Sequence, residues 1–178
     1  MNKSKKAKLL ELETKFCSEE SIADKPFYEM HYHSYFELEI VTKGKGKQIF
    51  DGKEFELKKG SIFLCTPLDS HQIFGQPLVF RHIQITKDVL PKWLLKEMYS
   101  VKNPIVFQLS ENDFETINEL MILAGKEYAN ANQIITEQIT AYCVLILSYY
   151  LKYAKDTDEH KKDSIVKNIY FYIIHHIK

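Results

Sequence analysis

The chain has 178 residues, of which 45% are hydrophobic and 13% aromatic, so it can form a folded core and is not intrinsically disordered. Its 24 basic side chains balance 24 acidic ones and Arg81 is the only arginine, which argues against a segment that reads DNA bases by itself. Cys17, Cys65 and Cys143 are widely spaced and form no CxxC pair, which favours a reducing compartment. The sequence shows no signal peptide and no bilayer-spanning apolar run, so we expect a cytoplasmic protein without a membrane partner.

The first two segments of the chain differ in periodicity. Residues 1–27 are expected to form a charged N-terminal arm, with a short helix over residues 8–16. Residues 28–108 are expected to be short strands, because turn signals recur roughly every ten residues. The Asp-Gly pair at 51–52 is typical of a two-residue hairpin, and the KGKG run at 43–46 is expected to end the strand before it. This spacing predicts a sandwich or barrel rather than alternating strands and helices.

Residues 109–154 are expected to form a helical hairpin. Ser110 with Asp113 three positions later resembles a capping box, and Asn130 and Asn132 interrupt the helical spacing between two helices. The apolar positions at helical spacing are Phe114, Ile117, Met121, Ala124 and Tyr128, followed by Ile135, Ile139, Tyr142, Ile146, Tyr149 and Tyr153. The stripe on the second helix is wider than one packing surface needs, so we expect the hairpin to join two copies of the chain as a homodimer.

The C-terminal part of the chain changes character twice. Residues 155–163 (KDTDEHKKD) contain no apolar side chain and are expected to be a solvated linker. Residues 164–178 resume the helical spacing at Ile165 and Ile169 and run to the chain end. We therefore expect them to be the truncated first helix of a further region.

The residues most suggestive of chemistry are two histidines and a glutamate near the start of the strand region. His31, His33 and Glu37 share one parity, so on a strand their side chains point to the same face. His71 follows downstream, on the far side of a turn that contains Pro67. Three imidazoles and one carboxylate on one face would suit a divalent transition metal with open coordination positions.

These residues carry a resemblance to a known family. The HxHxxxE pattern, with Gly44 after six intervening residues, is similar to the first cupin motif, and Gly60, Pro67 and His71 resemble a shortened second motif. The stretches HYHSYFELEIVTKGKG, DGKEFELKKGSIFLCTPLDSHQI and FRHIQI resemble the sensor domain of AraC-type transcription regulators. The two helices after them resemble that family's dimerisation hairpin, and SIVKNIYFYIIHHIK resembles the opening helix of its helix-turn-helix region. Ser61 departs from the pattern, because the family usually has aspartate there.

The resemblance implies a mainly β fold with α-helices, in which a cupin (jelly-roll) barrel is followed by a C-terminal helical hairpin. It implies a non-catalytic domain that senses a small polar effector such as a sugar and dimerises, with DNA bound only through a helix-turn-helix region absent from this chain. The alternative is a stand-alone metal-dependent cupin enzyme, of the dioxygenase or isomerase type, acting on a small polar substrate. The helical segments favour the sensor, because a cupin enzyme has no need of them.

The residues expected to line the ligand pocket come from the histidine motif and from alternate positions of the last strand. They are His31, His33, Glu37, His71, Phe80, His82 and Gln84. His31, His33, Glu37 and His71 are also the candidate metal ligands. In AraC-type sensors the same pattern serves as a hydrogen-bonding wall, so a pocket with a divalent transition metal and one without any cofactor both stay open. Glu39 shares the parity of Glu37 and is expected beyond the rim of the barrel.

Overall fold

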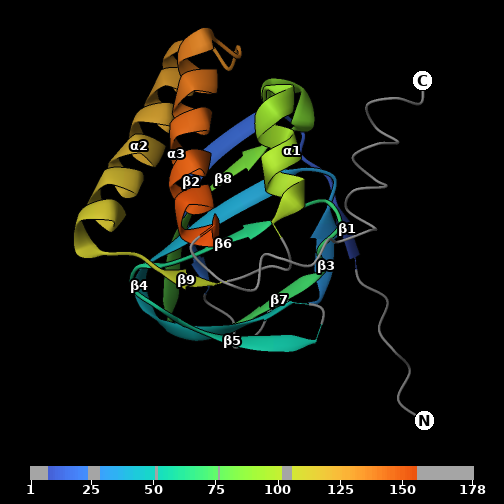
Figure 1. Ribbon diagram of the computed structural model, residues 1–178, viewed down its shortest axis with the longest axis vertical. Helices are drawn as coiled ribbons and strands as arrows, with labels where there is room; N and C mark the ends of the chain where they lie inside the picture. Colours follow the sequence, from blue (N-terminus) through green and yellow to red (C-terminus); the bar gives the residue numbers. More distant parts are fainter. Residues whose placement is uncertain (1–7, 24–28, 51, 76, 102–105, 156–178) are drawn as a thin grey trace.

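The computed structural model describes residues 8–23, 29–50, 52–75, 77–101 and 106–155 (Figure 1). The strands are β1 (Lys8–Leu10), β2 (Phe16–Ala23), β3 (His31–His33), β4 (Phe36–Phe50), β5 (Lys53–Lys58), β6 (Ser61–Cys65), β7 (His71–Phe74), β8 (Leu78–Ile85) and β9 (Phe107–Gln108). The helices are the 3-10 turn η1 (Lys87–Val89) and α1 (Lys92–Ser100), α2 (Glu111–Asn130) and α3 (Glu137–Lys155). The third helix expected at 164–178 and most of the expected linker lie outside the described residues.

Strand β4 belongs to two sheets. Its first half pairs with β6 and β8, and its second half pairs with β5 and β7. One sheet therefore runs β1–β3–β7–β4–β5 and the other runs β2–β8–β4–β6–β9. No ladder joins β5 to β6 or β9 among the described residues, so the two sheets form an open sandwich. The mainly β fold with C-terminal helices that the sequence predicted is confirmed.

The glycines of the KGKG run do not end the strand, contrary to the sequence expectation. β4 continues through them with a bulge between Val41 and Lys43 and a φ of 90° at Gly44. A Cβ on Gly44 would lie 2.1 Å from the carbonyl oxygen of Pro77, so only glycine lets the two backbones approach there. The expected hairpin at 51–52 is confirmed, because Phe50 pairs with Lys53 across it.

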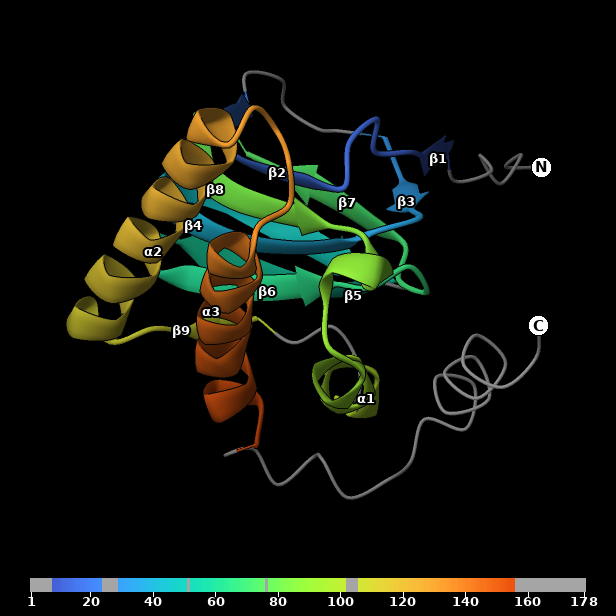
Figure 2. The ribbon, with the colours of Figure 1, turned by 90° about the horizontal axis from the view of Figure 1, so that it is seen from above.

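Side chains of the second sheet alternate between two cores. Phe36, Leu38 and Ile40 of β4 join the core beneath the helices, whereas Val41 joins the core between the two sheets. Helices α1, α2 and α3 cover the outer face of this sheet, and β5 and β7 lie on its far side (Figure 2). A polar residue on the inner face of β4 is therefore buried between the sheets and separated from the helices by the strand itself.

The helical hairpin after the strands is confirmed. The side chain of Ser110 accepts a hydrogen bond from the backbone N–H of Asp113 and caps α2. The hydroxyl of Tyr153 on α3 donates to the Asp113 carboxylate at 2.5 Å, which ties the two helices together. Asn132 and Gln133, both with positive φ, form the turn between them.

Two further expectations about local structure are wrong. Residues 8–16 do not form a helix: β1 occupies Lys8–Leu10, and β2 begins at Phe16 and pairs with β8 over its whole length. Tertiary pairing overrides the local pattern here, since Phe16 also packs its ring against Tyr128 of α2. The strand-rich stretch 28–108 also contains η1 and α1, whose Leu94, Leu95 and Met98 are buried against the sheet.

The close approach of Gly44 on β4 to the backbone of Pro77 leads to a stability prediction. Gly44→Ala should lower the free energy of unfolding by about 3 kcal/mol or more, because strain from a positive φ adds to a clash with a backbone carbonyl. Gly52→Ala is the matched control: its φ is +82° but no atom lies within 4 Å of an added Cβ, so the loss should be about 1 kcal/mol. Urea unfolding of both variants measures the difference, and equal losses would contradict the importance of the close approach.

Candidate functional site

The four residues of the histidine motif meet at one end of the sandwich. His31 and His33 lie on β3, Glu37 on β4 and His71 on β7, and His31 pairs directly with His71 in the β3–β7 ladder. Nε2 of His33 lies 2.9 Å from Nε2 of His71 and 3.1 Å from Oε2 of Glu37. The ring of His31 completes the group, with its centroid 4.2 Å from that of His71. Strand pairing thus places side by side residues that lie 40 positions apart in sequence (71 − 31).

The hydrogens available to this cluster are too few for its contacts. Nε2 of His33 faces both His71 and Glu37, but a ring nitrogen carries one hydrogen at most. Glu37 as a carboxylate only accepts, so at least one of the two contacts lacks a well-placed hydrogen. A cation or the donor group of a ligand among these atoms would satisfy all of them.

A second layer of residues orients the histidines. The side-chain amide of Gln48 lies 2.7 Å from Nδ1 of His71, and the Cys65 sulfur lies 3.2 Å from the same nitrogen. Tyr35 stacks on the ring of His33 with centroids 4.6 Å apart. Contacts of this kind fix ring orientation and tautomer around a binding site. The sequence reasoning missed Gln48, Cys65 and Tyr35. Gln48 has the opposite parity to Glu37, and both side chains face inward only because of the bulge between Val41 and Lys43.

Glu37 and Glu39 are both buried, but their pKa values shift in opposite directions. Burial opposes ionisation of Glu37, but the hydrogen bond from His33 and the electrostatic interaction with His33 and His71 lower its pKa far below the ordinary 4.5. Its other oxygen accepts from the Gln84 amide at 2.6 Å. Burial, followed by repulsion from Glu37, raises the pKa of Glu39 well above 4.5. The expectation that Glu39 lies beyond the rim is wrong: it is 2% exposed and faces the interior, because β4 continues inward past it.

The three alternating residues of β8 also face the space between the sheets. Phe80 belongs to the inner core, Gln84 bonds to Glu37, and His82 pairs in register with Glu39 of β4. His82 is 5% exposed, and neither of its ring nitrogens has a hydrogen bond among the described residues. The side chain of Glu39 likewise leaves Oε2 without a partner. The interior therefore presents polar groups that a bound molecule would satisfy.

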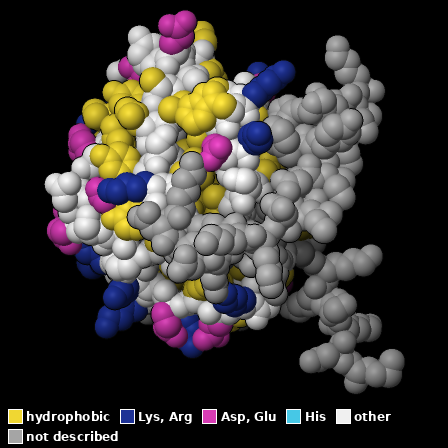
Figure 3. Space-filling view, in the orientation of Figure 1, with side chains coloured by type: hydrophobic (Ala, Val, Ile, Leu, Met, Phe, Trp, Pro, Cys, Tyr) yellow, Lys and Arg dark blue, Asp and Glu magenta, His cyan; other side chains and the backbone are white. Residues whose placement is uncertain are grey.

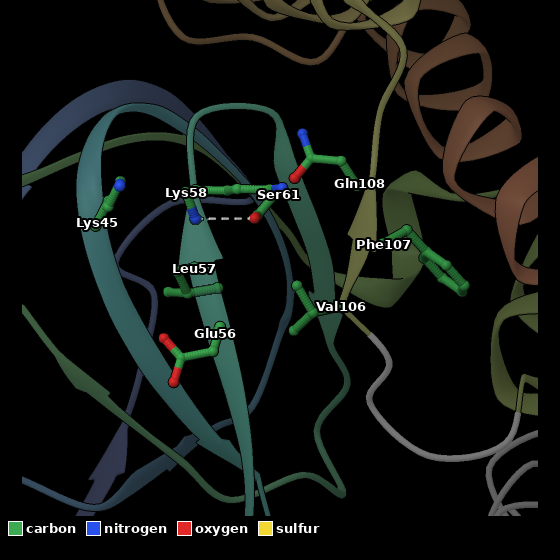
Figure 4. A pocket seen from close by; sticks show the side chains of 8 residues that line it. All are labelled: Lys45, Glu56, Leu57, Lys58, Ser61, Val106, Phe107 and Gln108. Carbon is green, nitrogen blue, oxygen red and sulfur yellow. Dashed lines mark hydrogen bonds between the residues drawn. The ribbon is translucent and has the colours of Figure 1, made fainter.

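A separate pocket of about 340 Å³ opens at the unpaired edge between the two sheets (Figure 4). Figure 4 shows Leu57 of β5 and Val106 before β9 on opposite sides of it, with Lys45 and Lys58 above them in the view. Its lining residues are Lys45, Glu56, Leu57, Lys58, Ser61, Val106, Phe107 and Gln108. None of the seven residues expected to bind a ligand lines it. The sequence could not indicate this pocket, because it exists only where β5 fails to pair with β9.

The described part of the chain is an open two-sheet sandwich with inward-facing polar residues, followed by a helical hairpin. Residues 14–138 match the family described as the AraC-like ligand binding domain, and the chain belongs to that family. It is a sensing domain of the AraC type rather than a free-standing metal enzyme, so the resemblance in the sequence is confirmed. Among the curated proteins, none matches the chain in sequence. In the part of the chain that the structure describes, no helix is long and apolar enough to cross a membrane.

Solved structures show the same fold. The AraC-like transcriptional activator CuxR superposes with a TM-score of 0.52 at 14% identity, over 79% of this chain and 50% of that one. ToxT from Vibrio cholerae O395, bound to (E)-4-(8-methylnaphthalen-1-yl)but-3-enoic acid, gives 0.55 at 14% identity, over 92% of this chain and 67% of ToxT. ToxT from strain SCE256, bound to an unsaturated fatty acid, gives 0.55 at 11% identity, over 91% and 64%. The chain thus spans half to two thirds of the length of these regulators.

The buried histidine of β7 generates a pH prediction. Burial lowers the pKa of His71 from 6.5 to about 3, so between these values the unfolded chain binds a proton that the folded chain does not. The neutral His71 imidazole therefore makes its full contribution to the free energy of unfolding above pH 6.5, and this contribution falls as the pH drops toward 3. At pH 5 the loss should be about 2 kcal/mol relative to pH 7.5. Urea unfolding of metal-free protein should show this slope, and His71→Asn should flatten it; an unchanged slope in the variant would contradict the assignment.

Proposed function

We propose that this domain binds a small polar effector between its sheets, without catalysing a reaction, and controls a DNA-binding region of an AraC-type regulator. The observation that carries the proposal is the set of buried polar atoms without a partner among the described residues, on Glu39, Gln48 and His82. Each such atom costs about 1–3 kcal/mol if it stays unsatisfied, so their concentration on one inner surface favours a ligand there.

The chemistry of this surface favours a neutral or cationic effector with several hydroxyl or amino groups. His82 offers two ring nitrogens, and Glu39 offers a carboxyl group whose pKa burial raises well above 4.5. Phe80 supplies an aromatic wall beside them, as a sugar-like molecule would require. ToxT holds carboxylic acids in two of the similar structures. In this chain the ionised Glu37 would repel an acid placed in the same space, so we propose a different effector class.

Strand β8 offers a route from the effector to the helices. His82 and Gln84 face the interior, whereas Ile83 packs in the core beneath the helices. Nε of Arg81 on the same strand donates to the side-chain oxygen of Asn118 on α2 at 2.9 Å. An effector that shifts β8 would therefore move groups in direct contact with α2.

A divalent transition metal is a compatible cofactor of this pocket. The ligating atoms of His31, His33 and His71 all lie within 4.8 Å of one another, and Glu37 adds a carboxylate to the group. The shortage of hydrogens among these atoms fits a cation placed among them. His31, His33, His71 and Glu37 would hold it, and it would supply a positive centre for an oxygen of the effector.

Effector binding can be tested with His33→Ala and His71→Ala. A panel of sugars, polyols, amines and carboxylic acids is screened by thermal shift, with EDTA and with added Zn²⁺. An effector at 100 times its Kd should stabilise the wild type by about 2.7 kcal/mol, and both variants should bind it about 10-fold or more weakly. Trp93→Ala is the control, since Trp93 is 56% exposed on α1. Normal binding and normal metal content in both histidine variants would place the site elsewhere.

We also propose that the helical hairpin joins two copies of the chain. Helix α3 buries Ile146 and Tyr150 against the sheet but leaves Leu145 49% exposed and Tyr149 only partly covered. Hydrophobic side chains also gather over the helical layer in the view of Figure 3. An exposed apolar strip on a helix is typical of an interface, and a two-fold dimer is the commonest way to cover it.

Leu145→Asp should convert the dimer to a monomer without unfolding it, because the charge is placed on an exposed position. Light scattering after size exclusion measures the mass, and circular dichroism checks the fold. Ile146→Asp is unsuitable, since Ile146 is fully buried within the chain. Lys53→Glu on β5, on the side away from the helices in Figure 1, is the control and should stay dimeric. A wild type that is monomeric at high micromolar concentration would overturn the proposal.

A further inference from the structure

A second cluster of metal-ligating side chains spans β2 and β8, outside the histidine motif. Cys17 and Glu19 are two residues apart on β2 and share one face of the strand. Glu19 pairs in register with His82 of β8. Cys17 pairs with Gln84, which is two positions beyond His82 on the same face of β8. One ligating atom each from Cys17, Glu19 and His82 lie within 4.8 Å of one another. A thiol, a carboxylate and an imidazole thus converge on one point.

His82 is the independent sign that something binds at this point. Its side chain is 6% exposed and its Nε2 lies 3.5 Å from Oε1 of Glu19, beyond the range of a good hydrogen bond. Neither ring nitrogen has a hydrogen-bond partner among the described residues. A buried imidazole directed at a carboxylate and a thiol without bonding to either is typical of a site that lacks its ion.

We propose that Cys17, Glu19 and His82 bind a divalent cation of the zinc type, at a site separate from the one formed by the histidine motif. Thiolate, imidazole and carboxylate are the three ligand types that zinc takes, and the presence of sulfur argues against magnesium or calcium. Three protein ligands leave one tetrahedral position for water or a ligand atom.

The surroundings of Cys17 are suited to a cation. Cys17 is a free, half-buried thiol. The carboxylates of Glu19 and Glu37 make the potential at the thiol negative, and burial, which is the larger cause, raises the Cys17 pKa together with them to about 11. A divalent cation would reverse this potential, and the thiol would release its proton as the metal–sulfur bond forms. The Glu19 carboxylate is 61% exposed, so it has room to turn toward the ion.

Such a site would join strand β2 to the proposed effector surface on β8. β2 is the edge strand of its sheet and pairs with β8 alone among the described residues. His82 would then serve as a metal ligand while its strand carries Gln84, which bonds to Glu37. Occupancy of the cation site would thereby hold β2 on β8 next to the motif. The inference does not depend on the identity of the effector or on a metal in the histidine motif.

Cobalt(II) titration of the metal-free chain tests the site, because only a cobalt–thiolate bond gives an intense near-ultraviolet charge-transfer band. The wild type should develop this band with one equivalent of Co²⁺, and Zn²⁺ should abolish it. Cys17→Ser should lose the band, whereas Cys65→Ser and Cys143→Ser should keep it. His33→Ala should also keep the band, which separates this site from the histidine motif. Glu19→Gln, which changes an exposed carboxylate, should weaken Co²⁺ binding about 10-fold or more.

Zinc should also protect Cys17 from alkylation by iodoacetamide, with the modified residue identified by mass spectrometry. Added zinc should lower the rate of Cys17 alkylation about 10-fold or more in the wild type and much less in Glu19→Gln. Absence of the cobalt band in the wild type would overturn the proposal. So would a band that survives in Cys17→Ser or disappears in Cys65→Ser, since the thiolate ligand would then come from the other cluster.

Discussion

The burial of an ionised carboxylate between two sheets is the constraint on which the structure of this domain depends. An uncompensated charge at Glu37 would cost several kcal/mol, so the fold must supply partners for both of its oxygens. Gln84 of β8 donates to one at 2.6 Å, and His33 next to β4 contacts the other at 3.1 Å. Nε2 of His71 on β7 lies 2.9 Å from Nε2 of His33. The polar groups that stabilise the Glu37 carboxylate therefore come from β3, β7 and β8, and these strands must hold their places relative to β4.

Strands β4 and β8 present different chemistry on their two faces, and this would link the proposed ligand binding to helix packing. Inward residues such as Glu39 and His82 form the polar surface, whereas Leu38 and Ile83 on the opposite face pack beneath the helices. A strand is only one residue thick, so a shift that satisfies a ligand on one face also displaces side chains on the other. The proposed effector surface and the helical hairpin are thus neighbours through the backbone of the same strands.

The sequence grouped several residues of the candidate site that the structure also brings together, and the residues it missed have a physical explanation. Parity along a strand was enough to group His31, His33 and Glu37, because the side-chain period of a strand is local. The cupin motif order brought His71 into the group. Gln48 was missed because the KGKG run seemed to end β4, and Cys17 and Glu19 were missed because β2 was read as an arm. Both errors concern strand pairing between distant segments, which local periodicity does not report.

The sequence by itself determined the mainly β architecture, the helical hairpin with its Ser110 cap, and membership of the AraC type, since periodicity, capping and motif order are properties of short segments. Only the tertiary structure decided that β4 crosses from one sheet to the other, that Glu39 is buried, and that β2 places a thiol and a carboxylate beside His82. These features depend on which distant strands pair and on where a glycine lets two backbones touch. The free energy that selects them comes from contacts between segments far apart in the chain.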